Sequence, residues 1–227
     1  MVLDADMFMT AKLDPIPHAL LRSMFPGPLL LSDHPGEHDL ALLWRMIALD
    51  KSGTAKVIKT EHPAIPLPSR VLDTSIMGTG VGRGCWASVT AGQGHIIAVW
   101  NVRDDETKAK VEDTLTMSDI LDTVGKDRFQ DSWIIARQNL SDGGFLAARS
   151  TEDRTDTIDN ISLDRIGAAS YWAIPTFRVL GYSMGVLGII HHFAGLVTID
   201  SICATDGMST AMVPNAAESS SGTCLQT

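Results

Sequence analysis

Ionisable side chains gather near the amino terminus, where their types could support chemistry. Asp4 and Asp6 stand two residues apart, and Arg22 and Asp33 follow within the next thirty residues. Carboxylates can attack, accept or donate protons, and hydrogen-bond a polar ligand, while an arginine can hold a carboxylate in place. Arg22 could therefore pair with Asp6 or Asp33, or it could be a solvated helix residue. Asp33 could also be a turn residue, because aspartate is common before a sequence such as His34-Pro35-Gly36.

The elements that must position these groups are predicted to alternate between helix and strand. His18 to Met24 is expected to form a short helix, which Pro26-Gly27-Pro28 would stop. Leu29 to Leu31 is a continuous apolar run of the kind found in parallel strands covered on both faces. Apolar residues at helical spacing predict a second helix from Glu37 to Leu49. We therefore interpret residues 1–55 as the last βα units of a (β/α)8 TIM barrel, a partial catalytic domain. On this interpretation Asp33 lies at the rim where barrel enzymes place functional side chains.

The character of the sequence changes after residue 55. Residues 56–70 are rich in proline and read as an extended linker. Residues 71–215 contain apolar β-type segments separated by glycine- and aspartate-rich turns, which predicts an antiparallel β-sandwich. The expected segments are Gly84–Ser88, His95–Val102, Trp133–Gln138, Gly144–Ala148, Tyr171–Leu180 and Val186–Ile199. The charged stretches Asp104 to Lys110 and Ser150 to Asp164 are interpreted as solvated loops. Residues 216–227 are low in hydrophobicity and are predicted to be a disordered tail.

Composition excludes several classes of partner. The chain has 227 residues and a formal net charge of −9, which disfavours nucleic acid because phosphates require a basic surface. The longest apolar stretch, Val179 to Ile190, is too short to span a bilayer, so no membrane association is expected. Asp4 and Asp6 occupy the place where a signal peptide carries positive charge. Three scattered cysteines without a CxxC spacing favour a reduced, cytoplasmic location. We expect no cofactor and no metal, and the composition leaves the oligomeric state open.

Two further motifs have weak support. The segment Gly181-x-Ser183-x-Gly185 matches the nucleophile elbow of α/β-hydrolases. That fold needs an acid and then a histidine downstream, but His191 and His192 follow with no acidic residue in between. A hydrolase that uses Ser183 is therefore only a minor alternative, and the segment is read as part of a β-hairpin. The alternating glycines from Gly78 to Gly84 lack the flanking strand, helix and Lys-Ser/Thr pair of a phosphate loop.

The ordered amino-terminal motifs resemble one enzyme family. They resemble the raffinose synthase and seed-imbibition-protein group of glycoside hydrolase family 36, which reads P-D-W-D-M-F, then H-A-A-A-R, then G-G-P-x-Y-x-S-D-x-P-G-x-H. The matching stretches here are Asp4-Ala5-Asp6-Met7-Phe8, His18-x-x-x-Arg22, and Gly27-Pro28-x-x-x-Ser32-Asp33-x-Pro35-Gly36-x-His38-Asp39. A later stretch, His95 to Val102, is similar to the family's G-x-L-x-V-x-N-V strand.

The resemblance implies a function and a set of site residues. It implies a retaining enzyme that transfers α-galactosyl groups or hydrolyses α-galactosides, with galactinol, sucrose or another α-galactoside as the small-molecule substrate. By the same resemblance Asp6 and Met7 line the sugar pocket, and Asp4, Arg22 and Asp33 are the other candidate binding residues. Retaining cleavage needs two carboxyl groups about 5–5.5 Å apart. The family's K-x-D nucleophile and S-D-D acid/base motifs, which precede this region, are not found here.

These observations leave two main functional expectations open. The first is a fragment of an α-galactosyl-transferring or hydrolysing enzyme, with no catalytic residues of its own and no activity alone. The second is a non-catalytic carbohydrate-binding or interaction module. Whether the acceptor would be sucrose, another sugar or water is left open by the sequence.

Overall fold

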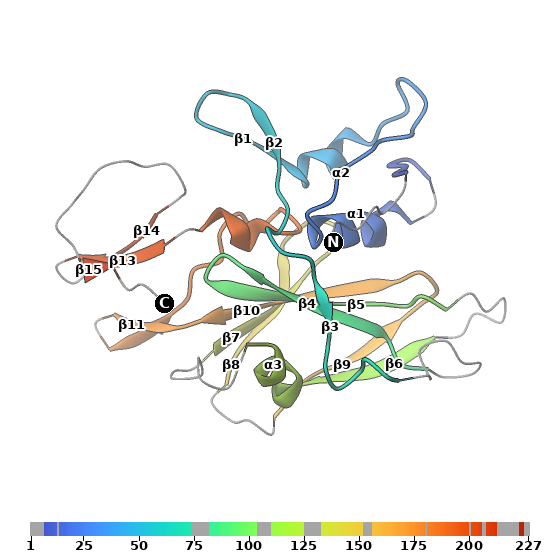
Figure 1. Ribbon diagram of the computed structural model, residues 1–227. Coiled ribbons are helices and arrows are strands. Elements are labelled where there is room, and N and C mark those ends of the chain that lie inside the picture. Colours follow the sequence, from blue (N-terminus) through green and yellow to red (C-terminus); the bar gives the residue numbers. More distant parts are fainter. Residues whose placement is uncertain are drawn as a thin grey trace.

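The computed structural model describes most of the chain in ten segments. These are residues 7–12, 14–73, 82–103, 110–124, 133–151, 156–179, 181–199, 201–205, 208–212 and 223–224. Asp4 and Asp6 therefore lie outside the described residues, as does most of the predicted tail. In the described part, short helices accompany many antiparallel strands (Figure 1).

A six-stranded antiparallel sheet forms the centre of the molecule. Its strand order is β3-β4-β5-β10-β7-β8. The bounds are Ile65–Pro66 for β3, Cys85–Ala91 for β4, Gly94–Trp100 for β5, Trp133–Gln138 for β7, Phe145–Thr151 for β8 and Ala168–Pro175 for β10. Every residue of β5 is buried, because β5 lies inside the sheet and both of its faces are covered. This double burial explains why the strand reads as a continuous apolar run rather than an alternating one.

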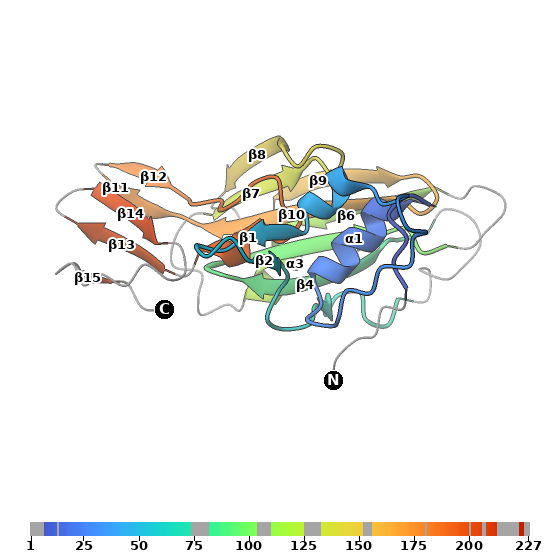
Figure 2. The same ribbon diagram turned by 90° about the horizontal axis from the view of Figure 1, so that it is seen from above.

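One face of the sheet packs against the amino-terminal helices. Helix α1 (Pro15–Ser23) begins at a proline, whose fixed φ suits the first helical turn, and buries Ala19 and Leu20. Helix α2 (Leu40–Trp44) is capped by the side chain of Asp39, which accepts a hydrogen bond from the Leu42 N–H. Figure 2 shows α1 lying over the sheet beside β4.

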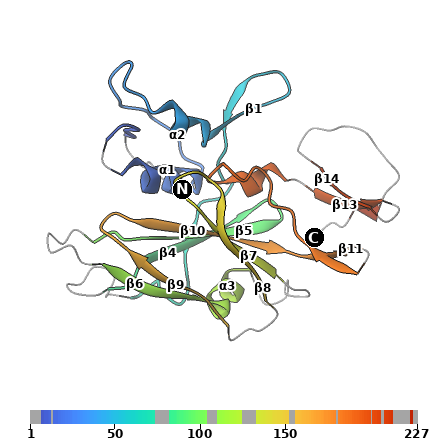
Figure 3. The same cartoon turned by 180° about the vertical axis from the view of Figure 1, so that it is seen from behind.

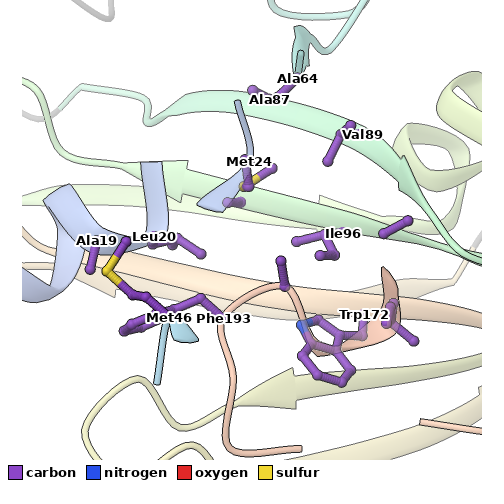
Figure 4. Packing of buried hydrophobic residues seen from close by; sticks show 14 of the residues in the cluster. Ala19, Leu20, Met24, Met46, Ala64, Ala87, Val89, Ile96, Trp172 and Phe193 are labelled. Carbon is purple, nitrogen blue, oxygen red and sulfur yellow. The ribbon is translucent and has the colours of Figure 1, made fainter. Parts of the chain in front are cut away.

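These helices share one hydrophobic core with the sheet. Leu20, Met24 and Met46 pack with Ile96 from β5 and Trp172 from β10 (Figure 4). The 3-10 helix Gly195–Thr198 and the segment before it add further apolar groups to the same core, including Phe193. The amino-terminal helices are thus held in place by the antiparallel sheet.

The other face of the sheet carries a second core. The two-stranded pair β6 (Val111–Thr116) and β9 (Thr157–Leu163) covers this face together with α3 (Met117–Val124) (Figure 3). The side chains of β5 alternate accordingly, with Ile96 and Ala98 in the first core and Ile97 and Val99 in the second.

The remaining strands form small antiparallel sheets. Two of them are pairs: β1 (Ile47–Leu49) with β2 (Ala55–Val57), and β11 (Phe177–Val179) with β12 (Tyr182–Met184). The third has the strand order β14-β13-β15, in which β14 is Met208–Met212, β13 is Ser201–Thr205 and β15 is Thr223–Cys224. A hairpin was expected from Arg178 to Ile199, but the β11–β12 hairpin ends at Met184, and Gly195–Thr198 is a 3-10 helix.

The expected end of a TIM barrel in residues 1–55 is wrong. The predicted second helix stops at Trp44, and Ile47–Leu49 then turns into an antiparallel pair with β2. The predicted buried strand Leu29–Leu31 contributes only one parallel bridge, between Leu31 and Phe8, and Leu30 and Leu31 are 52 % and 43 % exposed. The apolar side of α1 is buried on an antiparallel sheet instead of on parallel barrel strands. The described fold is therefore β-rich and mainly antiparallel.

Candidate ligand-binding site

A pocket opens at the end of the sheet where β4 begins and β5 ends. It has a volume of about 450 Å³ and lies between α1 and these strands. We call it the α1–β4 pocket. Its lining includes Leu21 of α1, Phe25, Cys85 and Ala87 of β4, and the turn before β10 at Ile166. A cavity of this size falls within the usual range for small-molecule sites, about 300–1,000 Å³.

Two tryptophans are among the lining residues. The Trp86 Nε1–H donates to Asp113 Oδ2 at 2.8 Å, and the Trp100 Nε1–H donates to the Pro17 carbonyl oxygen at 3.2 Å. Both residues line the pocket, but the Trp86 side chain belongs to the second core, whereas the Trp100 side chain belongs to the first core on the α1 side of the sheet. Because its only polar atom is already bonded to the protein, the Trp100 ring can offer a ligand apolar and π surface alone.

The most unusual group in this lining is Arg103. Its residue is only 5 % exposed, and its Nε, Nη1 and Nη2 atoms are buried without a hydrogen-bond partner in the described part of the chain. A guanidinium stays charged at any physiological pH and carries five N–H donors. Buried polar groups are nearly always hydrogen-bonded, so this side chain stands out from the rest of the lining.

The backbone around Arg103 is firmly placed. The Arg103 N–H donates to Asn101 Oδ1 at 3.2 Å, and the Asn101 Nδ2 donates to the carbonyl oxygens of Leu163 and Asp164 at 3.3 and 3.0 Å. The Asn101 N–H also bonds to the Gly167 carbonyl oxygen at 2.8 Å. The end of β5 is thereby tied to the turn before β10, which fixes the position of the Arg103 backbone.

The charged groups of this lining are all basic. Arg165 lines the pocket together with Arg103, and the lining residues include no aspartate or glutamate. This local excess of positive charge contrasts with the net charge of −9 of the whole chain.

Two groups in the lining could in principle react. Burial raises the pKa of the Cys85 thiol, which keeps it protonated and weakly nucleophilic at neutral pH. Desolvation by the pocket walls, helped by the charge of Arg22, lowers the pKa of His18, although Asp14 opposes this shift. Both groups are therefore neutral near pH 7, and neither is prepared for nucleophilic attack.

The sequence-predicted site residues occupy a different part of the amino-terminal unit. Met7 is described and is 60 % exposed. Arg22 is buried, donates from Nη2 to the Met7 carbonyl oxygen at 3.2 Å, and lies over the Phe8 ring at 4.9 Å from its centre. Arg22 thus holds the segment that carries Met7 against α1.

Asp33 holds the same segment from the other side. Its carboxylate accepts hydrogen bonds from the Thr10 N–H at 2.8 Å, the Thr10 hydroxyl at 2.9 Å and the Ala11 N–H at 3.2 Å, and His38 Nδ1 lies 3.3 Å away. Burial acts to raise the pKa of Asp33, but these hydrogen bonds outweigh it and lower the pKa to about 2. The lone pairs of this carboxylate are therefore largely occupied by the protein itself.

The Ser183 motif is not in the setting of a nucleophile elbow. Ser183 lies in β12 opposite Arg178 of β11, in a hairpin and not in a turn from strand to helix. His192 Nε2 lies 2.9 Å from the Ile47 carbonyl oxygen, and His191 Nδ1 lies 3.2 Å from that of Asp142. The two histidines are thus engaged with other parts of the backbone.

Arg103, Trp86 and Trp100 were not expected as site residues. The signal that could have identified Arg103 is its position directly after the long buried strand β5, where a charge is costly unless it has a role. The acidic residues that follow it, Asp104 and Asp105, made the stretch look solvated and lie outside the described residues.

Searches for membrane helices and metal sites covered the same described residues. None of their helices has the length and apolar character needed to cross a membrane. Within those residues, no cluster of at least three histidine, cysteine, aspartate or glutamate side chains is arranged to hold a metal ion. A scan against protein-family models and a search of curated proteins found no match to this chain.

Proposed function

We propose that this chain is a binding protein that holds a small, largely apolar organic molecule in the α1–β4 pocket without transforming it. The observation that carries the proposal is the pocket itself, about 450 Å³ in volume and lined by apolar residues that include Leu21, Phe25 and Trp100. A well-formed apolar cavity with a few convergent polar groups is the usual form of a small-molecule site.

The chemistry of the lining supports binding over bond cleavage. Retaining glycoside cleavage requires two carboxyl groups, whereas the described residues that line the pocket supply none. Cys85 is held as the thiol by burial, and the pKa of His18 is lowered so that it is uncharged near pH 7. What the pocket offers a ligand is mainly apolar surface.

A second candidate function follows from the resemblance to α-galactoside enzymes. In this proposal, the chain contributes a sugar-binding segment around Met7, either as part of an α-galactosyl-transferring enzyme or as a non-catalytic carbohydrate-binding module. The observation that favours it is the exposed Met7 side chain on a backbone that Arg22 and Asp33 hold in place. Galactinol, sucrose and related α-galactosides are the corresponding ligands.

The first proposal is tested with a neutral fluorescent dye. Nile red is titrated into the wild-type protein and into Ala87→Phe, which places a phenyl group in the pocket. We expect the variant to bind at least about tenfold more weakly, because the added ring occupies the ligand's volume. Leu72→Ser is the matched control, because Leu72 is 89 % exposed and could attract the dye nonspecifically. If Ala87→Phe is unfolded by circular dichroism, Leu21→Trp replaces it.

The outcomes of this titration are distinct. Loss of dye binding in the pocket-filling variant but not in Leu72→Ser supports the α1–β4 pocket as the site. Equal binding by all variants would overturn the proposal. The second candidate is tested separately by titrating raffinose and sucrose into wild-type protein and Met7→Ala, and it fails if neither sugar binds the wild type.

A further inference from the structure

We propose that the ligand of the α1–β4 pocket is an uncharged molecule of two or three rings with one hydroxyl group, which hydrogen-bonds to the imidazole of His18. The proposal rests on the proposed binding function and names the chemical class of the ligand. It starts from the way in which β4, β5 and α1 arrange apolar and polar side chains around one cavity.

The sheet supplies an uncharged floor to the pocket. The register of β4 and β5 places Ala87 opposite Ala98 and Cys85 opposite Trp100. Ala87, Ala98 and Trp100 belong to the first core, on the side of the sheet that α1 covers. Because side chains alternate along a strand, Cys85 lies on this same side, whereas Trp86 packs in the second core. The sheet therefore contributes methyl groups, a thiol and an aromatic ring to this side, but no charge.

Helix α1 supplies the opposite wall. His18 and Leu21 are three residues apart, and Phe25 follows four residues later, just past the C-cap Met24, so the three lie along one side of the helix. All three line the pocket. Leu21 and Phe25 are partly buried against the first core, whereas His18 is exposed. His18 therefore places a polar group at the rim of a cavity whose α1 wall is otherwise apolar.

The volume of the pocket sets the size of the ligand. An apolar protein cavity of about 150 Å³ accommodates one benzene ring. The α1–β4 pocket, at about 450 Å³, has room for two or three such rings. Flat rings suit its walls, because Phe25 and Trp100 present aromatic surface and aromatic rings attract one another in offset-stacked or edge-to-face arrangements.

The polar groups of the lining favour an uncharged ligand. The Trp100 N–H and the Asn101 amide already donate to backbone carbonyl groups, and the side-chain nitrogens of Arg103 are buried. Arg165 lines the pocket from an exposed position, where water and salt screen its charge. A charge carried in among the apolar walls would lose its hydration without gaining a buried partner.

The imidazole of His18 matches a hydroxyl group. Desolvation and the charge of Arg22 lower the pKa of His18 against the opposite effect of Asp14, so the ring is uncharged near pH 7. A neutral imidazole has one N–H donor and one nitrogen acceptor, and a hydroxyl group can likewise donate and accept. No hydrogen bond to the His18 ring comes from another described residue, so both functions can serve a ligand.

The test compares three neutral naphthalenes by isothermal titration calorimetry on the full chain at pH 7. 2-Naphthol carries the hydroxyl group, 2-methoxynaphthalene keeps the oxygen but has no donor, and 2-methylnaphthalene has neither. In the wild type we expect 2-naphthol to bind about three- to tenfold more tightly than 2-methylnaphthalene, the usual advantage of a neutral hydrogen bond, with 2-methoxynaphthalene in between.

Variants assign that advantage to His18. His18→Leu should remove the preference for 2-naphthol and leave the binding of 2-methylnaphthalene within about twofold, whereas His18→Gln should keep part of the preference because an amide also donates and accepts. His62→Leu is the matched control: it removes an exposed imidazole outside the pocket lining and should leave the preference unchanged. If His18→Leu is unfolded by circular dichroism, His18→Phe replaces it.

A protection experiment locates the ligand. Cys85 lines the pocket and is only partly buried, so it can react slowly with an alkylating agent. Saturating 2-naphthol should slow the alkylation of the Cys85 peptide, measured by mass spectrometry, in the wild type but not in Ala87→Phe. Unchanged alkylation in the wild type would place the bound naphthol elsewhere and overturn the proposal.

The failures of the two proposals are distinguishable. If 2-naphthol and 2-methylnaphthalene bind the wild type equally, the pocket is a binding site but the hydroxyl assignment is overturned. If the preference survives in His18→Leu, the role of His18 is overturned. If naphthalene-2-carboxylate, titrated alongside, binds more tightly than 2-naphthol, the assignment of an uncharged ligand is overturned. If no naphthalene binds and Nile red is also excluded, the proposed binding function itself fails.

Discussion

Two buried arginines of this protein differ in how their charge is paired. Arg70 is 8 % exposed and Arg103 is 5 % exposed. The Nη2 atom of Arg70 lies 3.4 Å from Asp113 Oδ1 and 3.7 Å from Asp119 Oδ2, and donates to the Thr114 carbonyl oxygen at 3.2 Å. The Nε of Arg70 is buried without a partner among the described residues, whereas all three side-chain nitrogens of Arg103 are.

The difference separates a buried charge that the protein pairs from one that it leaves unpaired. The carboxylates around Arg70 are themselves well bonded, since Asp113 accepts from Trp86 Nε1 and Asp119 accepts from the Ser69 hydroxyl, each at 2.8 Å. The region around Arg70 is thus a closed network that ties β6 and α3 to the sheet. The three side-chain nitrogens of Arg103 are instead buried without a hydrogen-bond partner among the described residues.

The sharpest test of this comparison is to remove Arg70. We expect Arg70→Met to lower the free energy of unfolding by about 3–5 kcal/mol, because Asp113 and Asp119 would remain buried without their cation. Urea denaturation followed by tryptophan fluorescence measures this loss. A loss no larger than that of the exposed control Arg178→Met would show that the network does not stabilise the fold.

Trp86 tests the hydrogen bonds that hold the carboxylates around Arg70. Trp86→Phe removes the Nε1–H bond to Asp113 but keeps an aromatic ring in the second core, so the free energy of unfolding should fall by about 1–3 kcal/mol. Trp100→Phe is the matched comparison, because its lost partner, the Pro17 carbonyl oxygen, is a neutral acceptor. A smaller loss for Trp86→Phe than for Trp100→Phe would contradict a special role for the Asp113 bond.

Removing Arg103 should have the opposite effect on stability. Arg103→Met is expected to leave the free energy of unfolding unchanged or to raise it by about 1 kcal/mol in the absence of ligand, because an unpaired buried charge is replaced by an apolar chain. The measurement is a urea denaturation curve of ligand-free protein. Strong destabilisation, comparable with that of Arg70→Met, would mean that Arg103 already has a partner within the protein.

Much of the central sheet could be predicted from the sequence. The strands expected at His95–Val102, Trp133–Gln138 and Gly144–Ala148 correspond to β5, β7 and β8. They were predictable because strands covered on both faces are continuously apolar and are bounded by glycine or aspartate turns. The antiparallel arrangement of this region follows from the short turns between neighbouring strands, such as Gly92-Gln93 between β4 and β5.

The errors occurred where the sequence pattern is ambiguous. Leu29–Leu31 is as apolar as a barrel strand, yet its residues are only partly covered, because a short apolar run does not define its own partner. The stretch Ser150 to Asp164 was interpreted as a charged loop but contains β9, whose Ile161 and Leu163 alternate with exposed residues. Asp159 in that strand is paired with Arg137 at 2.9 Å and bonded to the Tyr171 hydroxyl at 2.7 Å, which shows that its charge is compensated by neighbouring strands.

The candidate site depended on contacts distant in the sequence. Leu21, Trp86, Trp100 and Ile166 meet in one pocket, although they span more than half of the chain. Neither the hydrophobic periodicity nor a local motif predicts that these residues lie together, because their proximity depends on how α1 packs on the sheet. The amino-terminal candidates were chosen by a motif, and the contacts of Arg22 and Asp33 show how each supports the segment before α1.

Asp33 is a charged group of the opposite sign, and its carboxylate accepts hydrogen bonds mainly from backbone N–H groups. Its pKa in the folded protein is about 2, below its ordinary value of 3.8, because the hydrogen bonds from Thr10, Ala11 and His38 outweigh the effect of burial. Its stabilising contribution is therefore fully present above about pH 4 and is lost as the pH falls towards 2. We expect Asp33→Asn to be less stable than wild type at pH 6, with the difference shrinking steadily between pH 4 and pH 2.

Urea denaturation of both proteins at pH 6, 4, 3 and 2 measures this convergence, with Asp122→Asn as a control that neutralises an exposed carboxylate on α3. A constant difference between wild type and Asp33→Asn down to pH 2 would mean that Asp33 acts through shape and not through its charge. Convergence would place Asp33 with Arg70 among the charges that the fold has already satisfied. Both residues would then contrast with Arg103, whose side-chain nitrogens lack a partner among the described residues.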